Sequence, residues 1–370
     1  MIGRWLTRAD ESRRLPPTRG LMGLLWALAA IVLMPAAPSW AQPTAASVPT
    51  TTPVVATHFA VSPSAPQSAA PTAGFTVHEF DWIDASRQGR SVPVRLYLPH
   101  AASASATASA TAAAPVIVFS HGIGGSRRGY SYLGQHWASQ GYASLHLQHV
   151  GSDRGVWTGN PFAMFFRLQS AADESEAVAR VHDLRFALDR LLASEFAPRL
   201  DAKRIAAAGH SYGANTALLA AGAQVRRNGL VMDLHDARVR CAIIISAPPF
   251  YGETDTPAIL GPISVPTLHV TATDDVIRVP GYFSPASDRL AVFEATGGAT
   301  KVLAVFAGGS HSMFTDRAGT GGIEFNPQVK AATQALSVAF LRQVFEGEPL
   351  ALRQWPQRFA ALLARFTPPH

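Results

Sequence analysis

A serine flanked by glycines stands where a buried strand would meet a helix. Residues 209–213 are Gly-His-Ser-Tyr-Gly, with the apolar run RIAAAG before them and the small residues ANTALLAAGA after them. A serine at such a corner projects its hydroxyl from the end of the strand, and small flanking residues permit the sharp turn. The pattern predicts that Ser211 is a nucleophile. The alternative interpretation is an ordinary glycine–serine turn.

A serine hydroxyl needs a base, and the base needs an acid that orients it. His311 follows the apolar run KVLAVFAGG, and two adjacent aspartates, Asp274 and Asp275, follow the run PTLHVTAT. The chain order Ser, Asp, His is the order found where these groups come from successive strand ends. We therefore predict that His311 is the base and Asp275 the acid. Asp274 is the alternative acid.

Charge that develops on a carbonyl oxygen needs hydrogen-bond donors already in place. The loop Ser-His-Gly-Ile-Gly-Gly-Ser at 120–126 follows a strand-like run, and it predicts that the Ile123 N–H is one donor. The N–H of Tyr212, the residue after the serine, is the expected second donor. A glycine-rich loop could instead hold phosphate, but the phosphate-loop pattern G-x-x-x-x-G-K-[ST] is absent.

Apolar runs alternate with amphipathic segments along most of the chain. Strands are expected at 75–82, 92–99, 115–122, 142–150, 204–209, 238–249, 266–273 and 301–309. Helices are expected at 130–141, 172–194, 213–224 and 326–347, with a last amphipathic helix at 352–366. After an antiparallel first pair, this alternation predicts a mostly parallel sheet covered by helices on both faces, an α/β fold. Ligands of such sheets bind at the carboxyl ends of the strands.

The N-terminal part of the chain has the composition of an export signal followed by a spacer. Residues 1–41 combine five arginines with the apolar stretch GLMGLLWALAAIVLMPAA, and we expect cleavage after Ala41. A short membrane anchor is the alternative. Residues 42–72 are rich in Ala, Pro, Ser and Thr, and they predict a disordered spacer. The folded domain is then 73–370, with a low-complexity surface loop at 100–114, and the location is the periplasm or the exterior.

Charge and cysteine content exclude several classes of partner. Residues 1–41 carry five arginines against two acidic residues, so their removal would lower the formal charge of the chain from +6 to +3. The remainder has no basic block, so we expect no nucleic-acid partner, and no membrane span after cleavage. Cys241 is the only cysteine and lies in an apolar run, which predicts a buried structural role. No metal-ligand spacing is present, so neither a cofactor nor a metal is required. The oligomeric state stays open.

These motifs together resemble the α/β-hydrolase superfamily. The segments 119–153 and 209–214 are similar to platelet-activating factor acetylhydrolases and to bacterial predicted dienelactone hydrolases. The resemblance implies a sheet of the eight-stranded type and a carboxylic-ester hydrolase with Ser211 as nucleophile. Plasma-type acetylhydrolases carry their acid after the strand that follows the nucleophile helix, where this chain has Ser246-Ala247-Pro248-Pro249. True dienelactone hydrolases use a cysteine nucleophile. Because of these two departures, the resemblance implies a hydrolase but does not identify its substrate.

The leading hypothesis is therefore an exported serine esterase that acts on a small-molecule or lipid ester, with a short-acyl or lipid-like substrate. Two apolar segments rich in Phe and Pro, 161–169 and 247–263, would form the acyl pocket or a small lid. The alternative for these segments is ordinary loop packing. A peptidase or amide hydrolase would use the same residues, and a non-catalytic binding protein could keep the same fold.

Overall fold

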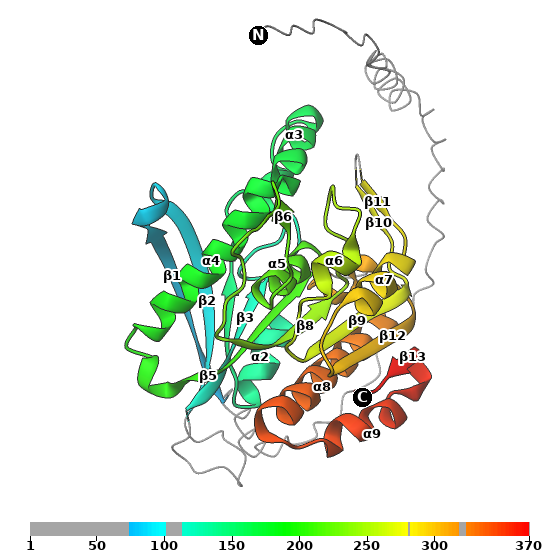
Figure 1. Cartoon of the computed structure of the whole chain (residues 1–370). Helices are drawn as coiled ribbons and strands as arrows, with labels where there is room; N and C mark the ends of the chain where they lie inside the picture. Colours follow the sequence, from blue (N-terminus) through cyan, green and yellow to red (C-terminus); the bar gives the residue numbers. More distant parts are fainter. Residues whose placement is uncertain (1–73, 101–112, 280–281, 318–322, 370) are drawn as a thin grey trace, which may run out of the picture. The chain divides into compact units, whose positions relative to one another are not determined.

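The computed structural model describes residues 74–100, 113–279, 282–317 and 323–369. The predicted signal segment, the predicted spacer and most of the low-complexity tract lie outside the described residues, so these three assignments stay predictions. In the described part, a nine-stranded sheet runs through the molecule in the order β1-β2-β4-β3-β5-β8-β9-β12-β13 (Figure 1).

The strands of this sheet are parallel in the centre and antiparallel at both ends. In chain order they are β1 Phe75–Asp84, β2 Arg90–Pro99, β3 Ala114–Ser120, β4 Ala143–Leu147, β5 Leu200–His210, β8 Val239–Ile245, β9 Thr267–Asp274, β12 Lys301–Ser310 and β13 Leu363–Thr367. Two small antiparallel pairs stand apart from the sheet: β6 Arg226–Arg227 with β7 Leu230–Val231, and β10 Ile277–Val279 with β11 Tyr282–Ser284.

Helices cover both faces of the sheet, as the alternation of strands and helices predicts. One face packs against α4 Glu174–Leu192, α5 Tyr212–Ala220, α6 Thr256–Leu260 and α7 Ser287–Ala295. The other face packs against α2 Ser131–Ser139, α8 Phe325–Glu346 and α9 Leu350–Arg358. The helix α3 Pro161–Ala172 precedes α4 and projects beyond the sheet (Figure 1).

The central strands are buried on both faces, which explains why their sequences are apolar runs without alternation. In β3, Val116 and Val118 belong to one hydrophobic cluster, whereas Ile117 and Phe119 belong to the other. Cys241 in β8 is fully buried in the second cluster, and burial raises the pKa of its thiol. The thiol is therefore held in its protonated, unreactive form, in agreement with the predicted structural role.

The structure corrects two expectations. The amphipathic segment 352–366 is not one helix: α9 ends at Arg358, and 363–367 form β13, which pairs with β12 and adds a ninth strand to the predicted eight-stranded type. The apolar segment 161–169, predicted as a loop, lies in α3, which Pro161 begins and the Asn160 side chain caps. Within the described residues, no helix is long and apolar enough to cross a membrane.

A backbone contact at the carboxyl edge of the sheet accounts for the two glycines of the 209–213 motif. A Cβ atom built on Gly213 would lie 1.9 Å from the carbonyl oxygen of Ser120, and one built on Gly209 would lie 2.1 Å from the carbonyl oxygen of Gly213. Both obstacles are backbone atoms, which cannot rotate away. The start of α5 is therefore pressed against the ends of β3 and β5.

We predict that Gly213→Ala destabilises the protein by about 3 kcal/mol, because the added methyl group forces backbone segments apart. Urea unfolding followed by circular dichroism measures this. Gly129→Ala is the matched control, because its Cβ would meet only the carbonyl oxygen of Ser126 at 3.4 Å, an ordinary contact. Equal unfolding midpoints for Gly213→Ala and the wild type would contradict the packing described.

Candidate active site

Ser211 occupies a strained turn between β5 and α5. Its backbone has φ 56° and ψ −125°, a positive φ that residues other than glycine rarely adopt. The Ser211 N–H donates to the carbonyl oxygen of Ile245 at 2.9 Å, which ties the turn to the end of β8. The turn lifts the serine hydroxyl out of the sheet, where it lines a cavity. This is the geometry expected of a nucleophile at a strand-to-helix corner.

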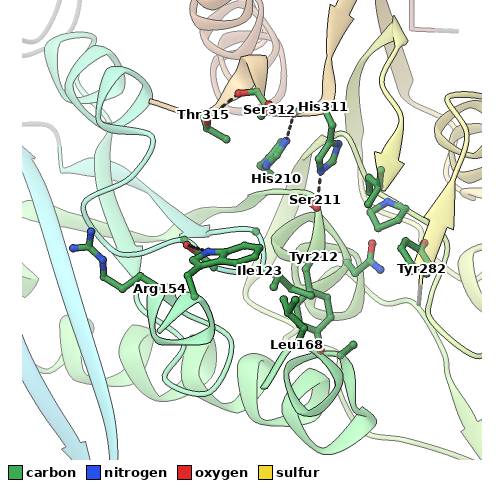
Figure 2. Close-up of a pocket in the computed structure, with 18 of the residues that line it drawn as sticks. Ile123, Arg154, Leu168, His210, Ser211, Tyr212, Tyr282, His311, Ser312 and Thr315 are labelled. Atoms are coloured by element: carbon green, nitrogen blue, oxygen red, sulfur yellow. Dashed lines mark hydrogen bonds between the residues drawn. The ribbon is translucent and has the colours of Figure 1, made fainter. Parts of the chain in front are cut away.

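His311 lies directly after β12, and its ring contacts both predicted partners. Its Nε2 atom is 2.8 Å from Ser211 Oγ (Figure 2), and its Nδ1 atom is 2.7 Å from Asp275 Oδ1. A carboxylate only accepts hydrogen bonds, so the Nδ1–H donates to Asp275. This tautomer leaves the Nε2 lone pair of the neutral ring facing the serine hydroxyl, ready to accept its proton.

Asp275 is buried and ionised. Burial acts to raise the pKa of its carboxyl group, but the hydrogen bond and charge interaction with His311, together with the buried Arg289, outweigh burial and hold the pKa well below its usual range. Its second oxygen accepts from Thr271 Oγ1 at 2.8 Å and from Ser246 Oγ. With partners on both oxygens, the carboxylate is fixed in one orientation toward the histidine.

Asp274, the alternative acid, does not reach the histidine. Its side chain is exposed at the end of β9, where Thr273 Oγ1 donates to it at 3.3 Å. The structure thus brings together Ser211, His311 and Asp275, and it leaves Asp274 outside this group. The turn that follows β9 rotates the second aspartate inward, as the predicted strand end requires.

Three side chains that support Asp275 were not predicted from the sequence: Ser246, Thr271 and Arg289. Ser246 lies at the end of β8, where plasma-type acetylhydrolases have their acid. The serine at this position was the one sequence feature that could have indicated a residue in contact with the acid. Its hydroxyl donates to Asp275 instead of contacting the histidine. Arg289 lies on α7, and its Nε atom is 3.7 Å from Asp275 Oδ1, with both side chains buried.

The predicted oxyanion donors face the same cavity as Ser211. Ile123 lies in the loop after β3, and among the described residues nothing accepts a hydrogen bond from its N–H. Tyr212 is the first residue of α5, so its N–H has no partner within the helix, and the positive end of the helix dipole lies there. A Cβ on Gly122 would be 3.1 Å from Ser211 Cβ, which shows how closely the loop approaches the serine.

The loop that carries Ile123 is hydrogen-bonded to a second loop of the chain, residues 148–157. The Gly124 N–H donates to the carbonyl oxygen of Ser152 at 2.8 Å, and Trp157 Nε1 donates to the carbonyl oxygen of Gly124 at 3.1 Å. Gly124 has φ +74°, and a Cβ there would lie 1.9 Å from the Trp157 ring. The indole therefore covers a stretch of backbone that only glycine leaves accessible.

Four other histidines, His121, His149, His210 and His269, are all buried. Burial lowers the pKa of His149 and of His269 to about 3 and lowers those of His121 and His210 well below the usual value, so all four are neutral near pH 7. His210 alone among them lines the cavity. It bonds to the Tyr130 hydroxyl at 2.8 Å and to the His311 carbonyl oxygen at 3.0 Å.

The cavity above Ser211 has a volume of about 1010 Å³ and opens to solvent. Aromatic side chains from distant parts of the chain line it, among them Trp157, Phe166, Tyr251 and Tyr282. Both apolar segments expected to form an acyl pocket or a lid contribute lining residues: Phe166, Leu168 and Gln169 from 161–169, and Pro248, Pro249 and Tyr251 from 247–263. Across the described residues, no three His, Cys, Asp or Glu side chains are arranged to hold a metal ion.

The sheet order, the strained serine turn and the position of His311 after β12 define the class of the protein, which has an α/β-hydrolase fold. The family model of platelet-activating factor acetylhydrolase, isoform II, matches residues 95–176. The resemblance predicted from 119–153 is thereby confirmed, whereas 209–214 lie beyond the matched part.

A solved structure of a ferulic acid esterase from Streptomyces cinnamoneus is similar to this chain, with 23% identity and a TM-score of 0.54. The match covers 76% of this chain and 93% of the esterase chain, which confirms the fold. A search of curated protein sequences finds no significant match. The matched family model and the similar structure both bear the names of ester-cleaving enzymes.

We predict that Asp275→Asn lowers kcat by about 10⁴-fold, because the amide cannot hold His311 in the tautomer that accepts the serine proton. Asp274→Asn is the matched control and is expected to retain activity within about twofold, as is usual for exposed positions away from the reacting groups. Initial rates on a chromogenic ester measure both. Equal rates for the two variants would show that Asp275 is not the acid.

Proposed function

We propose that the protein is a serine hydrolase that cleaves carboxylic esters through an acyl-enzyme. One observation carries the proposal: a continuous hydrogen-bonded line joins Ser211, His311 and the buried Asp275 at the floor of an open cavity. A neutral imidazole between a hydroxyl and a fixed carboxylate is the arrangement that activates serine as a nucleophile.

In the acylation half, His311 Nε2 accepts the Ser211 proton as Oγ attacks the ester carbonyl carbon. The negative charge that develops on the carbonyl oxygen is stabilised by the N–H groups of Ile123 and Tyr212, each worth about 3 kcal/mol of barrier. Asp275 stabilises the imidazolium formed in this step. His311 then gives its proton to the leaving alcohol, and the acyl group remains on Ser211.

In the deacylation half, water enters the open cavity and loses a proton to His311 Nε2 as it attacks the acyl carbon. The same two N–H groups stabilise the second oxyanion. Collapse of this intermediate returns the proton to Ser211 Oγ and releases the carboxylic acid. Among the protein groups, only Ser211 and His311 exchange protons; Asp275 and the two amides act through charge and hydrogen bonds.

The dimensions and lining of the cavity support a bulky ester within the predicted range of short-acyl to lipid-like substrates. Ligand pockets of about 300–1000 Å³ take drug-sized molecules, and this cavity of about 1010 Å³ is at the upper end of that range. The aromatic lining favours an apolar acyl or alcohol group. The names of the similar proteins, an acetylhydrolase and a ferulic acid esterase, favour an ester over an amide.

We propose further that the enzyme acts outside the cytoplasm, in the periplasm or the exterior, after removal of 1–41. The support is the composition of that segment, with arginines before an apolar stretch and small residues at 39–41. Intact-mass measurement of the protein from its native host should give a chain that begins at Gln42. A chain that retains the segment would favour the alternative of a membrane anchor.

The proposed activity is tested with p-nitrophenyl esters from acetate to palmitate and with a matched p-nitroanilide. We expect the wild type to turn over the esters and to be labelled by a fluorophosphonate. In Ser211→Ala, we expect kcat to fall by about 10⁴-fold or more and the labelling to disappear. Preferential cleavage of the anilide would favour an amide hydrolase. Absence of both turnover and labelling in the wild type would favour a binding protein.

A further inference from the structure

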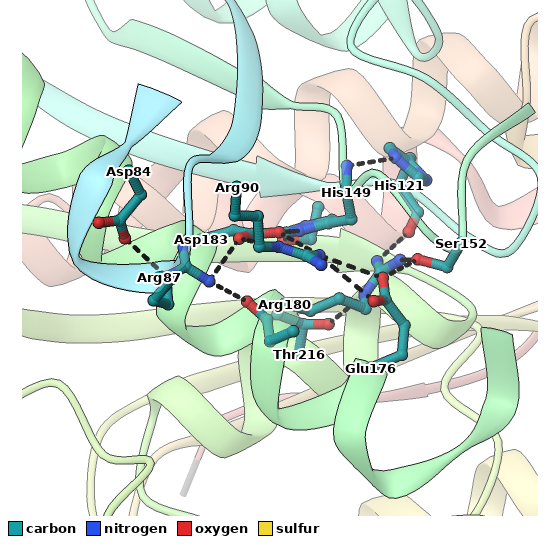
Figure 3. Close-up of polar contacts among 12 residues, drawn as sticks. Asp84, Arg87, Arg90, His121, His149, Ser152, Glu176, Arg180, Asp183 and Thr216 are labelled. Carbon is teal, nitrogen blue, oxygen red and sulfur yellow. Dashed lines mark hydrogen bonds and ion pairs between the residues drawn. The ribbon is translucent and has the colours of Figure 1, made fainter. Parts of the chain in front are cut away.

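An arginine that does not line the cavity lies beneath the proposed oxyanion site. Arg180, on α4, is fully buried and contacts three other segments of the chain: the loop after β3, the loop 148–157 and α5 (Figure 3). Burial of a charged group is costly unless its hydrogen-bonding atoms are satisfied, and burial lowers the pKa of this guanidinium. Every nitrogen of the group does have an acceptor here.

The acceptors of Arg180 lie on the segments that carry the oxyanion donors. Its Nη2 donates to the carbonyl oxygen of His121, two residues before Ile123. Its Nε donates at 2.9 Å to Thr216 Oγ1, which in turn donates at 3.2 Å to the carbonyl oxygen of Tyr212. The guanidinium also lies over the Tyr212 ring, 4.5 Å from the ring centre. One side chain thus contacts the loop after β3 and the first turn of α5.

The third acceptor connects Arg180 to the loop that holds Gly124. Its Nη1 donates at 2.7 Å to Ser152 Oγ, and the Ser152 hydroxyl donates at 2.8 Å to Glu176. The carbonyl oxygen of the same Ser152 accepts the Gly124 N–H. Ser152 is therefore bonded through its side chain to Arg180 and through its backbone to the residue after Ile123.

Two acidic residues that do not line the cavity, Glu176 and Asp183, compensate the charge of Arg180. On α4, Glu176 lies one turn before Arg180 and Asp183 lies one turn after it. The Arg90 side chain donates to both carboxylates. Asp183 accepts a hydrogen bond from His149 Nδ1 at 3.0 Å. The backbone N–H of His149 donates to His121 Nε2 at 3.1 Å. The pKa of Asp183 lies well below its usual range, because these hydrogen bonds outweigh its burial. Asp183 therefore stays ionised at neutral pH, whereas burial raises the pKa of Glu176.

We propose that Arg180 is a positioning residue that sets the distance and orientation between the two oxyanion N–H groups, of Ile123 and Tyr212. The inference rests on the proposed function, because it assigns a role in the same reaction. Arg180 contacts neither the substrate cavity nor the reacting atoms, so its effect passes through the backbone on either side. A displacement of about 1 Å at a reacting centre can lower a rate by about 100-fold.

The test compares Arg180→Met with Arg87→Met. Methionine keeps much of the bulk of the side chain but makes none of its hydrogen bonds. We expect Arg180→Met to lower kcat and kcat/KM equally, by about 10- to 100-fold, with KM nearly unchanged, because the lost interaction acts only in the transition state. Arg87 lies at the outer end of the same network, where it bonds to Asp84 and Asp183. Its variant should lose stability but retain kcat.

Two further readouts separate positioning from general loss of structure. The affinity for a phenylboronic acid, whose tetrahedral adduct with Ser211 places an oxygen at the oxyanion site, should fall by the same factor as kcat. The pH at which activity is half-maximal should stay that of the wild type, because the contacts of His311 with Ser211 and Asp275 are untouched. A purely structural role would lower the amount of folded enzyme, as titrated with a fluorophosphonate, without changing the rate per active site.

Two milder variants keep the inference testable if Arg180→Met does not fold. Arg180→Lys retains the charge but not the three-way hydrogen bonding, and Ser152→Ala removes one acceptor; each should lower kcat by about 3- to 10-fold with KM unchanged, a part of the loss expected for a displaced oxyanion donor. Folded variants with wild-type kcat would overturn the inference, and so would an equal loss in Arg87→Met. Absence of turnover in the wild type would instead contradict the proposed function.

Discussion

The arrangement of the site depends on a backbone contact between the start of α5 and the end of β3. The Ser120 carbonyl occupies the space that a side chain at 213 would need, so the helix that follows Ser211 begins directly against the strand that precedes the Ile123 loop. Both segments with candidate oxyanion amides leave the sheet at this point. Their separation is therefore determined first by the steric limits of the backbone, and the polar side chains adjust what this packing has already fixed.

Buried charges of opposite sign lie on the two sides of Ser211. The carboxylate of Asp275 lies behind His311, where positive charge would develop, and the guanidinium of Arg180 lies beneath the amides that would meet a negative oxygen. Neither Asp275 nor Arg180 lines the cavity, whose lining includes four other charged residues, Arg154, Asp173, Asp316 and Arg317. Fixed charges in a site of low polarity act strongly and need no reorganisation during the reaction.

The sequence predicts the features that follow a local pattern, such as a polar residue directly after an apolar strand. It does not predict the features that depend on contacts between distant parts of the chain. Ser211, Asp275 and His311 each follow an apolar run, so the rule that parallel strands end at one edge is enough to bring them together. Asp275 could be chosen over Asp274 because the expected strand end fixes which side chain turns inward. The same reasoning correctly predicted a buried, structural Cys241.

Other features have no local signal. Arg180 lies in an amphipathic helix pattern that places it on the buried face, yet nothing in the spacing of α4 shows that it contacts His121 or Thr216. Residues 363–367 have apolar residues at helical spacing, but pairing with β12 outweighs that local preference. Ser246, Thr271 and Arg289 support Asp275 from β8, β9 and α7, and only the folded sheet makes them neighbours.

The contact between Ser246 and Asp275 bears on how this fold changes over evolutionary time. The ends of β8 and β9 are adjacent, and the hydroxyl at 246 touches the same carboxylate that orients His311. A carboxylate introduced at the end of β8 would thus contact Asp275, and the two buried negative charges would repel each other unless they shared a proton. The two strand ends are therefore alternative positions for a single acid, and enzymes of this fold that differ in this position need not differ in mechanism.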